Sequence, residues 1–197
     1  MDLVENNSNT TNKLLSDKAR YHVSGYVNKQ NCCCWPPNIP HELQQHPLHN
    51  AEVKLWCAVS SHCIIGPYCF ETALGRTVNV HAERYKGMPE TFLCSELHPH
   101  QQHLLWFQQD GATAHTAQIS MQVLRTFPAD SFLCRGYQLP ARSPDLAVPD
   151  YFLWGYIKSR IYKTHPANIA DLKQRILERT QGIPKEMLQH VMTAFPS

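Results

Sequence analysis

Three aspartates, Asp17, Asp110 and Asp150, occupy positions where the sequence otherwise predicts an inward-facing, apolar surface. Asp17 lies in an alternating segment, Asp110 follows the apolar run 104–109, and Asp150 heads an apolar helical stripe. A buried carboxylate must be paired, hydrogen-bonded, neutralised or bound to metal, because its desolvation is costly. Converging carboxylates would suit Mg²⁺, and a pair of such ions can assist phosphoryl transfer. Taken singly, each aspartate fits a capping or turn role better than a metal site.

The strands expected around these aspartates follow from hydrophobic patterning. Residues 14–24 alternate strictly, with Leu15, Asp17, Ala19, Tyr21 and Val23 on one face, which predicts a strand buried on one side. A second strand is expected after Gly25, and residues 53–60 and 63–70 are expected to form a hairpin. The run 104–109 is apolar on both faces and should lie centrally in the sheet. Residues 131–137 are a short candidate strand.

Helices are expected at 83–97, 114–127, 150–162, 168–181 and from 185 onward. Pro149 suits a first helical position, and Asp150, Leu153, Trp154, Ile157 and Ile161 share one face. Asn168 is the expected N-cap of the fourth helix. Strands first, then strands mixed with helices, predict an α/β or α+β sheet with helical cover.

Composition limits the class of protein. The chain has 197 residues and a mass of 22.6 kDa, 43% of its residues are hydrophobic, and its net charge is +2, which suits one domain of ordinary size. The segment 151–197 carries seven lysines and arginines against three acidic residues, a net +4 that fits either weak nucleic-acid contact or a solvated face. No signal peptide or membrane-length apolar run is present, and the eight cysteines are expected to be mostly free thiols.

The blocks SDKARYHVSGYVNKQN, LWFQQDGATAHTA and RSPDLAVPDYFLWGYIKSRIYKT resemble the catalytic domain of the mariner/Tc-type (DDE/D) superfamily of cut-and-paste DNA transposases, in particular its arthropod members. The resemblance implies an RNase H-like fold, a mixed five-stranded sheet flanked by helices. It also implies a catalytic and metal-binding triad of Asp17, Asp110 and Asp150 with two Mg²⁺ or Mn²⁺ ions. DNA as partner, nuclear location and a possible homodimer are further implications, with neither a membrane nor a small-molecule cofactor.

The chain departs from this family beside the first aspartate. Lys18 and Arg20 stand where relatives carry Glu and His; strand alternation places both on the face opposite Asp17, although their charge is expected to weaken cation binding. Residues 13–183 would form the catalytic domain, after a disordered lead-in at 1–12 and before a truncated C-terminal helix at 184–197. No N-terminal helix-turn-helix module is expected.

Two interpretations of the function therefore stay open. The chain either keeps metal-dependent chemistry, or it is an inactive transposon-derived fragment that at most binds nucleic acid or a partner. Candidate nucleic-acid contacts are His115, Lys158, Arg160 and Lys163. A zinc module is a third and weaker interpretation, for which the candidate ligands are Cys32, Cys34, His46 and His49, or His98, His100 and His103.

Overall fold

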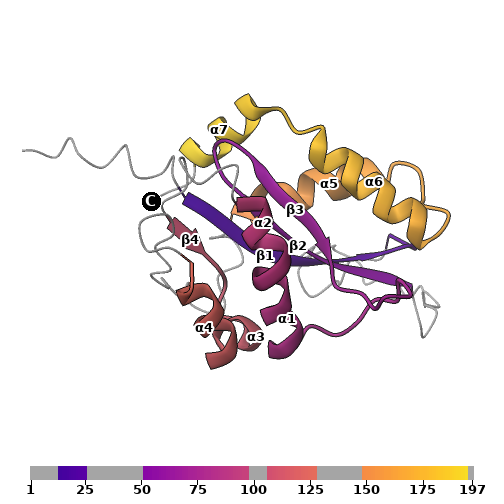
Figure 1. Ribbon diagram of the computed structural model, residues 1–197. Helices are drawn as coiled ribbons and strands as arrows, with labels where there is room; N and C mark the ends of the chain where they lie inside the picture. The colour runs from indigo at the N-terminus through magenta and orange to yellow at the C-terminus, as the bar shows by residue number, and fades with distance from the viewer. Residues whose placement is uncertain (1–12, 26–50, 98–105, 128–147, 195–197) are drawn as a thin grey trace, which may run out of the picture.

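The structure, a computed structural model, describes residues 13–25, 51–97, 106–127 and 148–194 (Figure 1). The predicted strands after Gly25 and at 131–137 lie outside these residues, as do all the candidate zinc ligands. The four described cysteines are free thiols, as predicted for this part of the chain. No helix within the described ranges is long and apolar enough to cross a membrane.

A mixed sheet forms the centre of the fold. Its strands are β1 Lys13–His22, β2 Glu52–Val59, β3 Ile64–Cys69 and β4 Trp106–Gln108. They are ordered β3-β2-β1-β4, with β1 antiparallel to β2 and parallel to β4. The strand predicted at 14–24 and the hairpin of β2 and β3 are confirmed. The prediction that the first strand is buried on one side only is wrong, because Leu14 and Ser16 on its other face are buried too. Within the described ranges β4 is an outer strand, whereas its apolar character predicted a central one.

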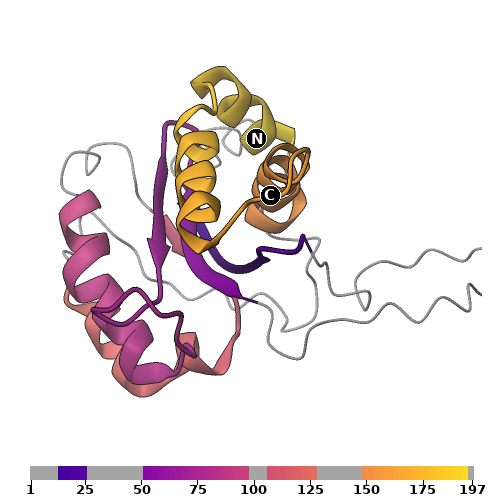
Figure 2. The same cartoon turned by 90° about the vertical axis from the view of Figure 1, so that its right-hand side faces the viewer.

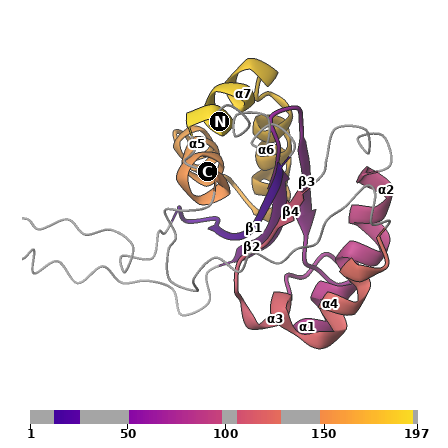
Figure 3. The same ribbon diagram turned by 90° about the vertical axis from the view of Figure 1, so that its left-hand side faces the viewer.

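Helices cover both faces of the sheet. One layer contains α1 Ala82–Met88, η2 Pro89–Leu93, α2 Cys94–Leu97, α3 Thr113–Thr116 and α4 Gln118–Arg125. The other contains η5 Pro149–Leu153, α5 Trp154–Ile161, α6 Ile169–Gln181 and α7 Lys185–Ala194. Figure 3 shows the sheet edge-on between the two layers, and Figure 2 shows them from the opposite side.

The two layers enclose separate hydrophobic cores, one on each face of the sheet. Leu15 and Tyr21 of β1 pack with Leu153, Ile157 and other residues of the C-terminal helices. On the other face, residues of β1, β2 and β4 pack against the first helical layer through Leu14, Trp56, Phe107, Tyr85 and Leu124. Burying an aliphatic side chain contributes about 1.5–3 kcal/mol, so each face fixes its helices firmly.

The C-terminal helices largely follow the sequence prediction. Leu153, Trp154, Ile157 and Ile161 form the buried stripe of η5 and α5. The Asn168 side chain accepts a hydrogen bond from the Asp171 N–H at 2.9 Å, which confirms the predicted N-cap of α6. The helix expected from residue 185 onward is α7.

The single helix predicted at 114–127 is wrong, because the chain breaks at Ala117, whose ψ of 140° is not helical. A continuous helix would need the carbonyl oxygens of Ala114 and His115 as acceptors for the following turn. Here the Ser120 hydroxyl donates to the first at 2.7 Å and the Gln109 side-chain amide donates to the second at 3.1 Å. Side chains thus replace the backbone donors and end α3 after one turn.

Gly66 in β3 has a backbone conformation and a close neighbour that disfavour any residue with a Cβ atom. Its φ is +109°, and an added Cβ would lie 2.8 Å from the Trp56 carbonyl oxygen on β2. We expect Gly66→Ala to lower the free energy of unfolding by about 3 kcal/mol, measured by chemical denaturation. The control is Gly87→Ala in α1, where a Cβ meets no atom within 4 Å and the change should be neutral or stabilising. Equal losses in both variants would contradict this assignment.

Candidate active site

Asp17 is a buried carboxylate on β1 with a hydrogen-bond donor of its own. Only 6% of the residue is exposed, and its Oδ2 accepts a hydrogen bond from Trp154 Nε1 at 2.7 Å. Burial is the main cause of the raised pKa of Asp17; the Trp154 hydrogen bond opposes this rise and the charge of Asp110 adds to it. Trp154 therefore orients the Asp17 carboxylate, whose ionised form is disfavoured by burial.

Asp110 lies at the same level of the sheet as Asp17. The parallel register pairs Leu15 of β1 with Gln108 of β4, and each aspartate follows its partner by two residues. Asp110 Oδ1 accepts the Ala112 N–H at 3.1 Å and also contacts His115 Nδ1. Burial raises the pKa of Asp110, but the hydrogen bond and charge of His115, with smaller contributions from Ala112 and Lys18, bring it below the ordinary value. Asp110 therefore has the lower pKa of the two carboxyl groups.

His115 is fully buried, and its position suits the support of Asp110. Its ring stacks on Tyr85 with centroids 4.0 Å apart, and the Gln109 amide donates to its carbonyl oxygen at 3.1 Å. The Tyr85 hydroxyl donates in turn to Gln109 Oε1 at 2.8 Å. Burial lowers the pKa of His115, which favours a neutral imidazole that can donate its Nδ1–H to Asp110. Its side chain has no exposed surface for the nucleic-acid contact expected from the sequence.

Asp150 joins the other two aspartates from the first turn of η5. Its side chain is exposed, yet its pKa is raised to about 7, first by desolvation, then by the charge of Asp17, a hydrogen bond with Asp17 and the charge of Asp110. Lys158 opposes this rise. The structure therefore places Asp150 beside Asp17 and within electrostatic range of Asp110.

The donor set suits a hard divalent cation, although the ligand shell is not closed. Mg²⁺ prefers oxygen ligands and is commonly held by one or two carboxylates with several waters. Asp17, Asp110 and Asp150 supply such oxygens, and a cation would relieve the repulsion that, after desolvation, contributes to the raised pKa of Asp150. Among the described residues, no three His, Cys, Asp or Glu side chains are placed to hold one ion together.

The basic residues predicted near the site have separate surroundings. Lys158 lies 5.4 Å from the centroid of the Tyr21 ring, and Asp150 and Asp17 raise its pKa against the larger lowering by burial. The Arg160 guanidinium lies 3.4 Å from the centroid of the Tyr156 ring, and Lys163 is exposed. Lys158 is thus the one of these three whose charge acts on the carboxylates.

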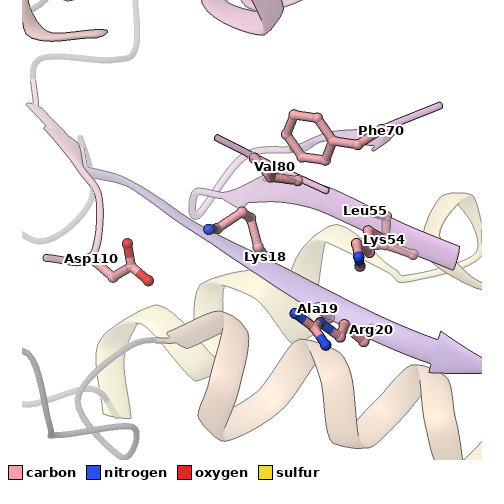
Figure 4. A pocket seen from close by; sticks show the side chains of 8 residues that line it. All are labelled: Lys18, Ala19, Arg20, Lys54, Leu55, Phe70, Val80 and Asp110. Carbon is pink, nitrogen blue, oxygen red and sulfur yellow. The ribbon is translucent and has the colours of Figure 1, made fainter. Parts of the chain in front are cut away.

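Lys18 comes closer to the carboxylates than strand alternation suggested. It leaves β1 on the face opposite Asp17, as predicted, but its side chain points toward Asp110 (Figure 4). Burial lowers the pKa of Lys18, while the charges of Asp110 and Asp17 raise it. A cation bound at Asp110 would therefore meet this positive charge.

Sequence reasoning missed three supporting residues, Trp154, Gln109 and Tyr85. Trp154 was assigned only to the apolar stripe, although its position four residues after Asp150 places both on one helical face. Gln109 directly precedes Asp110, but nothing in the sequence indicates that its amide reaches back to His115. Tyr85 belongs to α1, and only the tertiary structure brings it to the site.

The fold is the RNase H-like arrangement of a mixed sheet flanked by helices, as predicted, with four strands within the described residues. The structure is similar to the Mos1 transposase paired-end complex with the left transposon end, with a TM-score of 0.72 and 17% identity over 96% of this chain. It is also similar to the catalytic domain of Mos1 mariner transposase (TM-score 0.68, 17% identity, 96% of this chain and 79% of that one). The similarity to a Mos1 mariner paired-end complex with Mn has a TM-score of 0.71 and 19% identity over 96% of this chain.

These similarities establish a shared fold. This chain covers 54% of the transposase chain in both paired-end complexes, so it spans about half their length. The sequence matches no protein-family model and no curated protein.

The hydrogen bond between Trp154 and Asp17 should contribute measurably to stability. We expect Trp154→Phe to lower the free energy of unfolding by about 2 kcal/mol beyond the loss from reduced packing, because a buried carboxylate loses its donor. The control is Trp56→Phe, since Trp56 is also buried and its Nε1 has no partner among the described residues. Urea denaturation at neutral pH measures both variants. Equal losses would show that the hydrogen bond contributes nothing.

The raised pKa of Asp150 predicts a pH-dependent stability without divalent ions. Between pH 3.8 and about 7, Asp150 holds a proton in the folded state and is ionised in the unfolded state. Proton binding at Asp150 therefore stabilises the fold fully below pH 4, and this stabilisation is lost as the pH rises through 7. We expect the stability advantage of Asp150→Asn over wild type in EDTA to grow between pH 5 and 8, as measured by thermal unfolding. Added Mn²⁺ should reduce that difference at pH 8. A difference independent of pH would contradict the assignment.

Proposed function

We propose that this protein performs metal-dependent phosphodiester cleavage and strand transfer on DNA, as a cut-and-paste transposase does. The observation that carries the proposal is the placement of Asp150 beside Asp17 and within electrostatic range of Asp110, where desolvation first, and then the charges of these two carboxylates, raise the pKa of Asp150 to about 7. Such repulsion at an open carboxylate cluster is typical of a site that binds cations. The shared fold with Mos1 structures, one of them with Mn and one with a transposon end, supports the same proposal.

The chain's residues have separate roles in this proposal. Asp17, Asp110 and Asp150 would hold one or two Mg²⁺ or Mn²⁺ ions, which when bound supply an activated attacking oxygen and charge stabilisation. Trp154 orients Asp17, and His115 with the Ala112 N–H orients Asp110. Asp150 must release its proton before it can act as a ligand.

The proposed assembly follows the sequence prediction. DNA is the proposed partner in the nucleus, with Lys158, Arg160 and Lys163 as candidate phosphate contacts and a homodimer as the candidate form. Residues 13–183 are the proposed catalytic domain. Recognition of transposon ends would need elements beyond those described.

A second candidate function is nucleic-acid binding without catalysis. The position of Lys18 favours it, because a lysine directed at Asp110 opposes the binding of a divalent ion and attracts phosphate. The two functions make different predictions for a carboxylate substitution. Binding without chemistry needs no ionised Asp110, whereas phosphodiester transfer does.

Nicking of supercoiled plasmid in Mg²⁺ or Mn²⁺ tests the proposed activity. We expect Asp110→Asn to reduce the nicking rate by more than about 100-fold, because changes to mere outer-shell partners of metal ligands already reduce activity or affinity 10–100-fold. The control, Asp171→Asn, changes a carboxylate of α6 that pairs with Arg175, and it should nick like wild type. EDTA should abolish nicking by the wild type and by Asp171→Asn.

The outcome separates the two candidates. A folded wild type that nicks in neither metal, yet binds DNA equally well with and without Asp110→Asn, would leave only the binding function. Circular dichroism confirms that each variant is folded.

A further inference from the structure

A basic cleft adjoins the carboxylates on the face of the sheet opposite Asp17. Its volume is about 230 Å³. Figure 4 shows the charged side chains along β1 and β2, with Asp110 at one end and apolar side chains above them. The lining residues on which the argument depends are Lys18, Arg20, Lys54, Asp110, Phe70 and Val80.

Two of the three cations of this cleft have no counter-ion in the described part of the chain. Lys54 donates to Asn79 and forms an ion pair with Glu52 at 3.0 Å. Lys18 and Arg20 form no ion pair with any described residue, and Arg20 is exposed. Within the described residues, the charge of Arg20 is therefore available, and the charge of Lys18 is opposed only in part, by Asp110 and Asp17 nearby.

The register places these like charges close together. Arg20 and Lys54 are directly opposite on neighbouring antiparallel strands, and Lys18 precedes Arg20 by two residues on the same face of β1. Like charges directly opposite destabilise a sheet. An anion bound between them would remove that repulsion, and the cavity provides a place for it.

The size and the groups of the cleft favour a phosphate group. Ligand sites for drug-sized molecules measure about 300–1,000 Å³, so this cavity is too small for one. A guanidinium supplies two parallel donors for phosphate oxygens, and an ammonium supplies a compact point charge. Alternate residues on a strand are about 6.6 Å apart, so Lys18 and Arg20 can contact neighbouring phosphates.

We propose that Lys18 and Arg20, with Lys54 behind them, bind the phosphodiester backbone of one nucleic-acid strand and lead it along β1 toward Asp110. This inference deepens the proposed function by naming the surface that holds the strand beside the carboxylates. It needs neither metal nor catalysis, so its failure and the failure of the proposed activity are separable. Free inorganic phosphate carries the same kind of charged oxygens as the phosphodiester backbone and is the competing ligand for this cleft.

Fluorescence anisotropy of a labelled single-stranded oligonucleotide in EDTA tests this cleft. Each lost phosphate contact should weaken binding about fivefold near 0.1 M salt and reduce the salt slope by about 0.7. We therefore expect Lys18→Gln with Arg20→Gln to lose about 25-fold in affinity, and the exchanged pair Lys18→Arg with Arg20→Lys to bind nearly as wild type. An abasic strand should bind like the normal one, because backbone contacts do not involve the bases.

The control variant, Arg179→Gln, removes an exposed charge from α6 on the other face of the sheet and should bind like wild type. Asp110→Asn should bind at least as tightly as wild type even where it abolishes nicking. The proposal is overturned if the double variant binds like Arg179→Gln. It is also overturned if inorganic phosphate displaces the strand at an equal concentration of phosphate groups. Circular dichroism and thermal unfolding verify that the double variant is folded.

Discussion

The rest of the structure depends on holding Asp17 and Asp110 at one level of two parallel strands. The pairing of Leu15 with Gln108 fixes that level, and desolvation together with mutual repulsion makes it unfavourable. The protein offsets this with one donor from each helical layer, the Trp154 indole from the C-terminal side and the His115 imidazole from the other. Each helical layer therefore contacts one of the two carboxylates, and the sheet separates the two donors.

Much of the fold follows from local patterning, but its exceptions do not. The strand β1, the buried stripe of α5 and the Asn168 cap depend on neighbouring residues, so the sequence predicts them. The break at Ala117 depends on Gln109 and Ser120, whose side chains take carbonyl acceptors from a helix that propensity alone would continue. Tertiary contacts overrule local preference at the turn that carries His115.

The candidate site divides in the same way. Patterning indicates which carboxylates face inward, because a charge on an apolar face is visible in the sequence. Some of the groups that stabilise them are far away in the chain: Trp154 is 137 residues from Asp17, and Tyr85 supports Asp110 by contacts with Gln109 and His115. In the sequence, such donors cannot be distinguished from ordinary core residues. The sequence therefore identifies the buried carboxylates but not the side chains that donate hydrogen bonds to them.

Strand alternation also has a limit that explains the position of Lys18. Faces separate side chains only while a strand has a neighbour, and Asp110 lies two residues beyond the last residue of β4. There the sheet no longer stands between its two sides, so a lysine from one face can point toward a carboxylate associated with the other. Its positive charge disfavours a metal ion at Asp110 and favours phosphate beside it. In the proposed phosphodiester transfer, the same residue therefore weakens one requirement and strengthens another, because a phosphate that neutralises Lys18 would also make Asp110 more receptive to a cation.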